Sequence, residues 1–208
     1  MSLYEYDLYL IREFDLGSLL DEIIEAGLLQ PSDDDSGNIL GQIGCFFHEV
    51  INQAVPSSPL RIVKLELDNV QFETFLQSNA QKFILWLQLL FKQHNIAYAF
   101  IGGGSYAAYY EEAGITSETV FKQVGHLIEK GIVEIVHPMM FYAERLGQGK
   151  VCATAKGAPY NVYEIPGVGC LLLLISGNIH SNQIEILDPG NIYPKLRHYF
   201  QEKVINLH

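Results

Sequence analysis

The chain has 208 residues, of which 49% are hydrophobic and 18% are charged, and its mean hydropathy is +0.12. This composition excludes intrinsic disorder, and the length suits one well-buried domain. With 24 acidic and 13 basic residues, the formal charge is −11. A phosphate backbone would be repelled by this charge, so we expect no nucleic-acid partner. An acidic chain could instead complement a basic protein, although such charge also serves solubility.

The first residues, the apolar runs and the cysteines of the sequence bear on where the protein works. The first twenty residues mix acids with apolar residues and lack a basic leader, so we expect no secretory signal. The longest uncharged apolar run, "VGCLLLLI", is far shorter than the roughly 20 residues of a membrane helix, so we expect no membrane partner. Cys45, Cys152 and Cys170 form no CxxC pair, which favours a reducing cytoplasm without a disulfide framework. No cofactor or metal site is predicted.

The first elements alternate between strand and helix. Residues 4–12, "YEYDLYLIR", are predicted to form a strand. Apolar residues at helical spacing predict a helix over 16–29, which stops near Gly27. Residues 30–38, "QPSDDDSGN", are typical of a solvated loop, because their aspartates lack the glycine and glutamate spacing of a calcium loop.

The middle of the chain contains the strongest helical pattern. We expect a short helix over 45–54, "CFFHEVINQA", and then a strand over 60–68, "LRIVKLELD". Residues 70–94 form the longest helical pattern, with a stripe of phenylalanine and leucine that we interpret as core. A strand then enters the glycine cluster at 102–104.

The second half is predicted to consist mainly of strands. A capped helix is expected over 116–130 and a closing helix over 192–206. Between them, runs separated by Gly, Pro and Asn predict strands within 131–146, 149–155, 160–165, 170–176 and 182–188.

These elements predict the fold class α+β, with helices mostly in the first half packed on an antiparallel sheet from the second half. We expect a single domain over 1–208. Within it, we divide the chain into an N-terminal strand-helix extension (1–37), a core (38–190) and a C-terminal helix (191–208).

One set of residues has the order expected for nucleophilic cysteine catalysis. Such chemistry needs a thiolate at a helix N-terminus, an imidazole within reach and a group that orients the imidazole. Cys45 lies at a predicted helix start, Gln42 just upstream is a candidate oxyanion donor, and Asp188 follows a late strand. The alternative is that Cys45 is a small core residue and that Asp188 belongs to an ordinary Asp-Pro-Gly turn.

The motifs "GQIGCFFHEV", "LIEKGIVEIVHPMMFY", "GCLLLLISG" and "IEILDPG" follow one another in that order. This order resembles the papain-like cysteine peptidase superfamily, above all the bacteriocin-leader-processing peptidases and related acyltransferase-like domains. In those proteins a cysteine opens a buried helix, a glycine-histidine pair heads one strand, and a later strand ends in Asp-Pro. The resemblance covers roughly residues 38–190 and implies a papain-like fold with Cys45 as nucleophile and Asp188 as orienting group.

The sequence departs from that family at the histidine. Cys170 follows Gly169 where the family has its histidine, and a second thiol cannot replace an imidazole as proton acceptor. Gln42 is also closer to the cysteine than in the family. Among the other histidines, His48 and His180 are poorly placed for the role, and His137 is the remaining candidate base. The simplest interpretation of Cys152 and Cys170 is that they are core residues.

Four functional hypotheses remain open. The favoured one is a papain-like scaffold without a complete catalytic triad that binds a peptide or protein. Its aromatic residues near the presumed cleft would suit peptide recognition: Tyr106, Tyr109, Tyr110, Phe141 and Tyr142. The alternatives are a thiol-dependent peptidase or acyltransferase that uses Cys45, and an acidic immunity- or antitoxin-type inhibitor of a basic protein. A winged-helix module is disfavoured because Lys122 and Lys130 are the only lysines of its helix.

Overall fold

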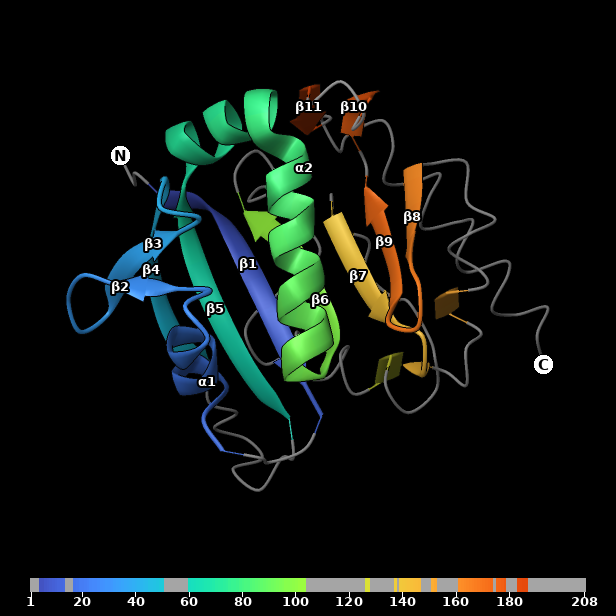
Figure 1. Cartoon of the computed structure of the whole chain (residues 1–208), viewed down its shortest axis with the longest axis horizontal. Helices are drawn as coiled ribbons and strands as arrows, with labels where there is room; N and C mark the ends of the chain where they lie inside the picture. The colour runs from blue at the N-terminus through green and yellow to red at the C-terminus, as the bar shows by residue number, and fades with distance from the viewer. Residues whose placement is uncertain are drawn as a thin grey trace.

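The structure is a computed structural model, and it describes residues 4–13, 17–50, 60–103, 126–127, 137, 139–146, 151–152, 161–173, 175–178 and 183–186. Strands dominate these ranges. Their bounds are β1 (Tyr4–Arg12), β2 (Gln30–Pro31), β3 (Ser36–Ile39), β4 (Ile43–Val50), β5 (Arg61–Asp68), β6 (Ile96–Gly103), β7 (Met139–Ala143), β8 (Asn161–Ile165), β9 (Gly169–Leu173), β10 (Ile175–Asn178) and β11 (Gln183–Ile186). Within the described ranges, the first nine form a sheet in the order β2-β3-β4-β5-β1-β6-β7-β9-β8 (Figure 1). All of its neighbouring strands are antiparallel.

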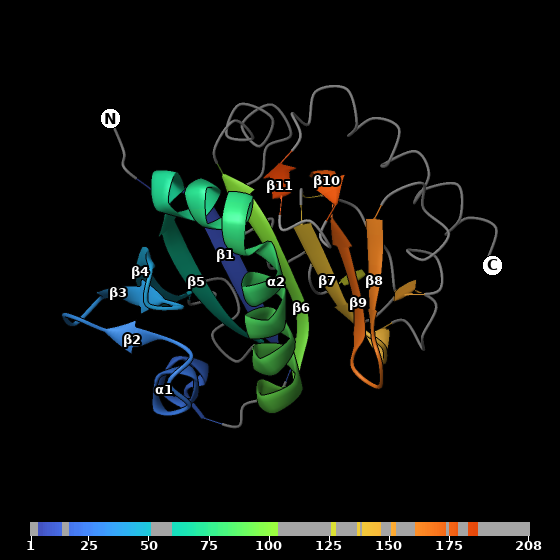
Figure 2. The ribbon, with the colours of Figure 1, turned by 45° about the horizontal axis from the view of Figure 1, so that its top comes forward.

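Two capped helices lie against this sheet. Helix α1 (Leu19–Glu25) begins after Ser18, whose Oγ accepts a hydrogen bond from the backbone N–H of Asp21. Helix α2 (Asn69–His94) begins after Asp68, which caps it in the same way. Figure 1 shows α2 lying across the sheet, and Figure 2 shows the β10–β11 hairpin at the end of the molecule where α2 begins.

The predicted fold class is wrong. The sequence predicts an α+β, papain-like arrangement in which helices mostly from the first half pack on an antiparallel sheet from the second half. Instead, the strands β1–β6 all precede residue 104 and contribute most of the sheet, and α2 follows strands. Among the described residues only α1 and α2 are helices of a full turn or more, so the class leans towards all-β.

The helix predicted over 45–54 is also wrong, because this segment contains most of strand β4. Its side chains alternate: Ile43, Cys45 and Phe47 are buried, whereas Phe46 and His48 are exposed. This period of two is that of a strand with one covered face. The neighbouring apolar residues "CFF" concealed the alternation and gave the appearance of a helical stripe.

Several other predictions are confirmed. Residues 4–12 and 60–68 contain β1 and β5, and the helix predicted over 70–94 is α2. The predicted loop at 30–38 is wrong in part, since β2 and β3 pair there across a turn of exposed aspartates. The apolar run at 170–176 is divided between β9 and β10, which belong to different sheets.

Two further predictions concern segments that are mostly not described. Val151 and Cys152 are helical, which contradicts the strand predicted at 149–155 for these two residues. His126 and Leu127 are helical, while the remainder of 116–130 and the closing helix at 192–206 fall outside the described residues.

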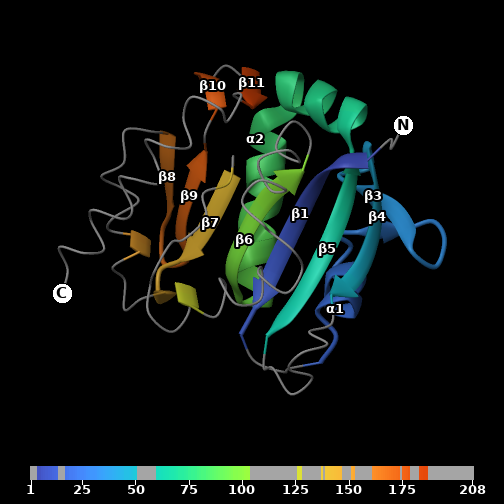
Figure 3. The same ribbon diagram turned by 180° about the vertical axis from the view of Figure 1, so that it is seen from behind.

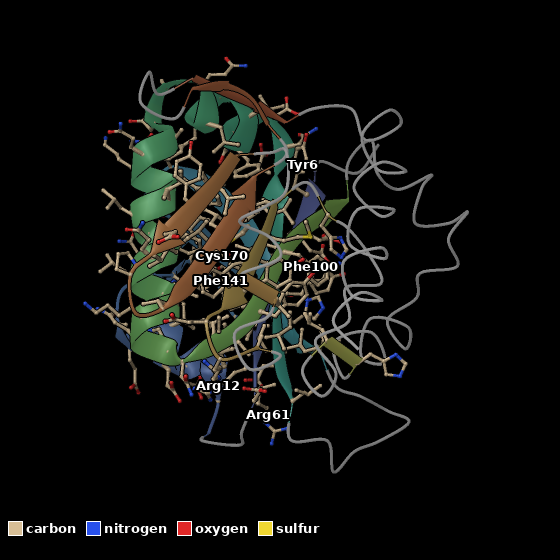
Figure 4. The ribbon with its side chains drawn as sticks, turned by 90° about the vertical axis from the view of Figure 1, so that its right-hand side faces the viewer. Tyr6, Arg12, Arg61, Phe100, Phe141 and Cys170 are labelled. Carbon is tan, nitrogen blue, oxygen red and sulfur yellow. The ribbon has the colours of Figure 1, made fainter. Side chains whose placement is uncertain are left out.

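The two faces of the sheet can be assigned from register. Tyr6 contacts Phe72 of α2, and Phe141 stacks on Phe91 of α2 with ring centroids 3.6 Å apart. We call the face that carries Tyr6 and Phe141 the front face. Because side chains alternate along a strand, Phe100 belongs to the opposite, back face. Figure 4 shows Phe100 farther from α2 than Phe141.

The core lies mainly between the front face and α2. The apolar residues of β1, β5 and β6 on this face are fully buried. They pack under the stripe that the sequence predicted along α2. Its largest members are Phe72, Phe83, Trp86, Leu87, Leu90 and Phe91. Burial of this face is the main source of stability of the fold.

One buried ionic cluster fastens α1 to the end of the sheet. Arg12 is 1% exposed, and it donates hydrogen bonds to Glu22 Oε2 at 2.7 Å and to the carbonyl oxygen of Gly17 at 2.8 Å. The same carboxylate oxygen lies 3.4 Å from Nδ1 of His94. Arg61 is the cross-strand partner of Arg12, and Figure 4 shows both at this end of the sheet.

Candidate functional site

The structure places Cys45 inside the core. Cys45 pairs with Leu67, which in turn pairs with Tyr6, so the thiol belongs to the front face. It is 2% exposed, and burial raises the pKa of the Cys45 thiol to about 12. The expected helix N-terminus is absent, because Cys45 lies within β4. This environment disfavours a thiolate.

The candidate histidine bases lie on the other side of the sheet. His48 is three residues from Cys45 on the same strand and therefore faces the back. His137 stacks on Phe100 with ring centroids 3.9 Å apart, which also places it on the back face. Burial lowers the pKa of His137 to about 3, so its ring is neutral. The sheet separates both histidines from the Cys45 thiol.

Of the other predicted catalytic residues only Gln42 is described, and it does not join Cys45. Gln42 is exposed in the turn between β3 and β4, where its backbone N–H donates to the carbonyl oxygen of Ile39 at 3.2 Å. Leu40 and Gly41 have positive φ values of 55° and 67° in this turn, as a type I′ turn requires. Asp188 and His180 lie outside the described residues.

The two described members of the predicted aromatic binding set do not lie on an accessible surface. Phe141 faces α2 and Tyr142 faces the back, and both are fully buried. Tyr106, Tyr109 and Tyr110 lie outside the described residues. Cys170 is buried beside Tyr142 as its cross-strand partner, and the Sγ of Cys152 contacts the carbonyl oxygen of Tyr142 at 3.3 Å. Both thiols therefore occupy the interior.

The structure brings together a different set of residues on the back face of β4, β5 and β1. This face of the sheet is turned towards the viewer in Figure 3. We call this set the back-face patch. Its members are Phe46, His48, Lys64, Glu66, Asp7 and Tyr9. All six are exposed or partly exposed, and Phe46 is 38% exposed.

Strand register arranges the back-face patch in two rows. Phe46, Glu66 and Asp7 are cross-strand partners in one row. His48, Lys64 and Tyr9 are partners in the next row. Because directly opposed side chains are about 5 Å apart, the six form one continuous surface.

Lys64 links the charged members of the back-face patch. Its Nζ lies 2.8 Å from Glu66 Oε1 and 3.1 Å from Asp7 Oδ2. It also lies 5.9 Å from the centre of the Tyr9 ring, within cation–π range. Two carboxylates thus share one ammonium group, which leaves one negative charge without a partner in these two ion pairs.

Burial and charge act differently on the two ends of the Lys64–Asp7 pair. Burial raises the pKa of Asp7 and outweighs the opposing attraction of Lys64. Burial acts to lower the pKa of Lys64, but its hydrogen bond to Glu66 and the nearby Tyr9 and Asp7 raise that pKa overall. Burial and the Asp7 charge raise the pKa of Tyr9 to about 12. Lys64 therefore stays charged at neutral pH, and Tyr9 keeps its hydroxyl proton.

An aromatic stack extends from the back-face patch into the interior. Tyr9 stacks on Phe100 with ring centroids 4.6 Å apart, and His137 stacks on the same Phe100 ring. Phe100 is 3% exposed and His137 is 4% exposed. This packing fixes the orientation of the Tyr9 ring, because it is held between Phe100 and the ammonium of Lys64.

The back-face patch presents ion-paired and aromatic groups that suit the binding of a ligand. Lys64 is held as an ammonium by two carboxylates, so it is a poor nucleophile and base. Among the described residues, no three side chains of His, Cys, Asp or Glu are placed to hold a metal ion. None of the described helices is long and apolar enough to cross a membrane.

Sequence reasoning missed the back-face patch although part of its signal is visible. Asp7 and Tyr9 are two residues apart in one strand, as are Lys64 and Glu66 in another, so each pair had to share a face. The sequence did not reveal that the two strands are neighbours.

No known protein family, curated protein or solved structure matches the chain.

Proposed function

We propose that the protein is a peptide- or protein-binding module whose back-face patch recognises a positively charged segment of its partner. The observation that carries this proposal is the pairing of Asp7 directly opposite Glu66 at the surface, with Lys64 bonded to both. Like charges opposed across two strands destabilise a sheet. A cationic side chain from a partner would neutralise the remaining negative charge and remove that cost.

The aromatic members of the back-face patch suit the same ligand. The exposed Phe46 ring lies in the row of Glu66 and Asp7. A guanidinium or ammonium group bound at the two carboxylates would have its aliphatic carbons against an aromatic side chain. The formal charge of −11 would accelerate encounter with such a partner.

This proposal includes an acidic inhibitor of a basic protein as one special case, since such an inhibitor would use the same charge complementarity. A thiol-dependent reaction at Cys45 gains no support from the described geometry, in which the thiol is buried and its pKa is raised.

The test is a binding titration with two synthetic probes. Fluorescein-labelled twelve-residue peptides that alternate leucine with either lysine or glutamine are titrated with the protein, and fluorescence anisotropy is measured at physiological salt. We expect the lysine peptide to bind at least about tenfold more tightly than the glutamine peptide. The double variant Asp7→Asn/Glu66→Gln should lose about tenfold in affinity for the lysine peptide.

The matched control is Glu25→Gln/Asp34→Asn, which removes the same number of charges from exposed positions in α1 and in the β2–β3 turn. It should change the affinity by less than about twofold. If both double variants weaken binding equally, attraction is due to net charge alone and the proposal is wrong. If neither peptide binds, the proposal is also wrong.

A further inference from the structure

A second surface, on the outer side of α2, has a regular pattern of its own. Leu85 is 57% exposed and Leu89 is 48% exposed, although the opposite side of the same helix is fully buried in the core. The two leucines are one turn apart and therefore adjacent. Figure 1 shows α2 lying across the sheet, so this side of the helix faces away from it.

Two exposed lysines extend the pattern at both ends. Lys82 precedes Leu85 by three positions, and Lys92 follows Leu89 by three positions. The spacing 82, 85, 89, 92 is the three-four-three spacing of one seam of a coiled coil. We call these four residues the α2 seam. They lie in the segment from Ala80 to His94, roughly 22 Å long, after the non-helical backbone of Asn79.

The α2 seam has a local charge opposite to that of the whole protein. Residues 74–94 contain no Asp or Glu, in a chain with 24 acidic residues. In the part of the chain that the structure describes, the salt bridges include neither Lys82 nor Lys92. The seam is thus an apolar centre with an unneutralised positive charge at each end.

This charge pattern argues against a second copy of the chain as the occupant. A parallel pair of α2 seams would place Lys82 against Lys82 and Lys92 against Lys92. An antiparallel pair would place Lys82 against Lys92. Both arrangements oppose like charges at each end of the contact, and such repulsion works against pairing.

We propose that the α2 seam docks an amphipathic helix of a partner protein, with apolar residues at the centre of its contact face and acidic residues at both ends. Such a helix would cover Leu85 and Leu89 and pair its carboxylates with Lys82 and Lys92. This docking surface is separate from the back-face patch, and the proposal does not depend on the function proposed for that patch.

The experiment uses two labelled helical peptides of about 20 residues with the same leucine seam, one with glutamates and one with lysines at its ends. Anisotropy titrations of the full chain carrying Asp7→Asn/Glu66→Gln, which removes the acidic pair of the back-face patch that would hold the lysine-ended peptide, should show at least about tenfold tighter binding of the glutamate-ended peptide. Leu85→Ala/Leu89→Ala should remove most of this binding. Lys82→Glu/Lys92→Glu should reverse the preference, because it exchanges the charge at both ends.

Val70→Ala is the control, since Val70 is another exposed apolar residue of α2, at 66%, and lies outside the seam. It should leave the affinity within about twofold. Trp86 fluorescence and circular dichroism verify that each variant is folded. If Lys82→Glu/Lys92→Glu still binds the glutamate-ended peptide more tightly than the lysine-ended peptide, the proposal is overturned.

Two further outcomes would also overturn it. Sedimentation velocity that shows dimers in the wild type and monomers in Leu85→Ala/Leu89→Ala would identify a second copy as the occupant. The other outcome is that neither peptide binds, whereas the wild type binds phosphatidylglycerol vesicles and Leu85→Ala/Leu89→Ala does not. That outcome would identify a lipid surface as the occupant instead.

Discussion

The two faces of the same strands treat charge in different ways. On the front face, β1 contributes Leu8 and Leu10 to the core, where both are fully buried. Cys45 of β4 is buried in the same core. On the back face, the alternate positions of the same strands carry Asp7 and Tyr9 at a partly exposed surface. The front face of these strands carries fully buried apolar side chains, whereas their back face keeps two opposed carboxylates whose mutual repulsion costs stability although Lys64 bonds to both. A local cost of this kind is what the proposed recognition surface would entail.

Protection of Cys45 is the largest effect that separates the two faces. Because the thiol is buried and its pKa is about 12, iodoacetamide should alkylate it at least about a thousandfold more slowly in the folded protein than in concentrated urea. Peptide mass spectrometry distinguishes it from Cys152 and Cys170. Rapid alkylation of native Cys45 with an apparent pKa below about 8.5 would contradict the closed front face and restore the thiolate hypothesis.

Truncation of a buried front-face ring is expected to have the next largest effect, a loss in the free energy of unfolding. Phe141→Ala removes a fully buried ring stacked on Phe91, and we expect a loss of about 3–5 kcal/mol in the free energy of unfolding. Phe46→Ala, on the back face, should cost less than about 1 kcal/mol. Urea titrations followed by the fluorescence of Trp86, the single tryptophan, measure both. Equal losses would remove the distinction between the faces.

Glu22→Gln tests the ionic cluster on the front face. The substitution leaves the buried Arg12 without its counter-ion, at an expected cost on the order of 2–3 kcal/mol at pH 7. Burial acts to raise the pKa of Glu22, but its hydrogen bonds with Arg12 and His94 lower that pKa below its ordinary value of 4.5. Its stabilisation is therefore complete above pH 4.5 and is lost as the pH falls through the folded pKa.

Urea titrations at several pH values check this dependence. The difference between wild type and Glu22→Gln should shrink below pH 4.5, while Glu25→Gln should stay within about 0.5 kcal/mol of wild type throughout. A difference that is independent of pH would show that Glu22 acts through packing rather than charge.

The smallest expected effect has the opposite sign. Since burial raises the pKa of Asp7, the folded protein holds this proton more tightly than the unfolded chain, and stability falls as the pH rises above 3.8 through the folded pKa. Asp7→Asn should therefore raise the free energy of unfolding at pH 7 by on the order of 0.2–1 kcal/mol, although it weakens binding of the lysine peptide. A loss of more than about 1 kcal/mol would mean that Asp7 is a structural residue.

The sequence predicted elements whose signals are local. The stripe of α2 lies within one segment, and so does the alternation of β5. The prediction of a helix at β4 was wrong because Cys45, Phe46 and Phe47 are adjacent apolar residues. Only burial by distant strands decides which of them face the core. Period alone does not separate such a run from a helix.

Cys45 and His137 are not brought together for a different physical reason. Residue type alone suggests this pair, but the sheet places the two side chains on opposite faces. The back-face patch requires β1 to lie beside β5, which is more than forty residues away along the chain. Pairing at that separation is determined by the packing of the whole sheet, and a single sequence carries little direct signal for it.

Recognition by the back-face patch requires that Asp7 contacts a cationic side chain of the ligand. A double-mutant cycle tests it most directly, with each lysine of the lysine peptide replaced in turn by glutamine and combined with Asp7→Asn. We predict a coupling energy of about 1 kcal/mol or more for at least one lysine, and none for the same peptides combined with Glu25→Gln. Coupling below about 0.3 kcal/mol at every lysine would contradict recognition by the back-face patch.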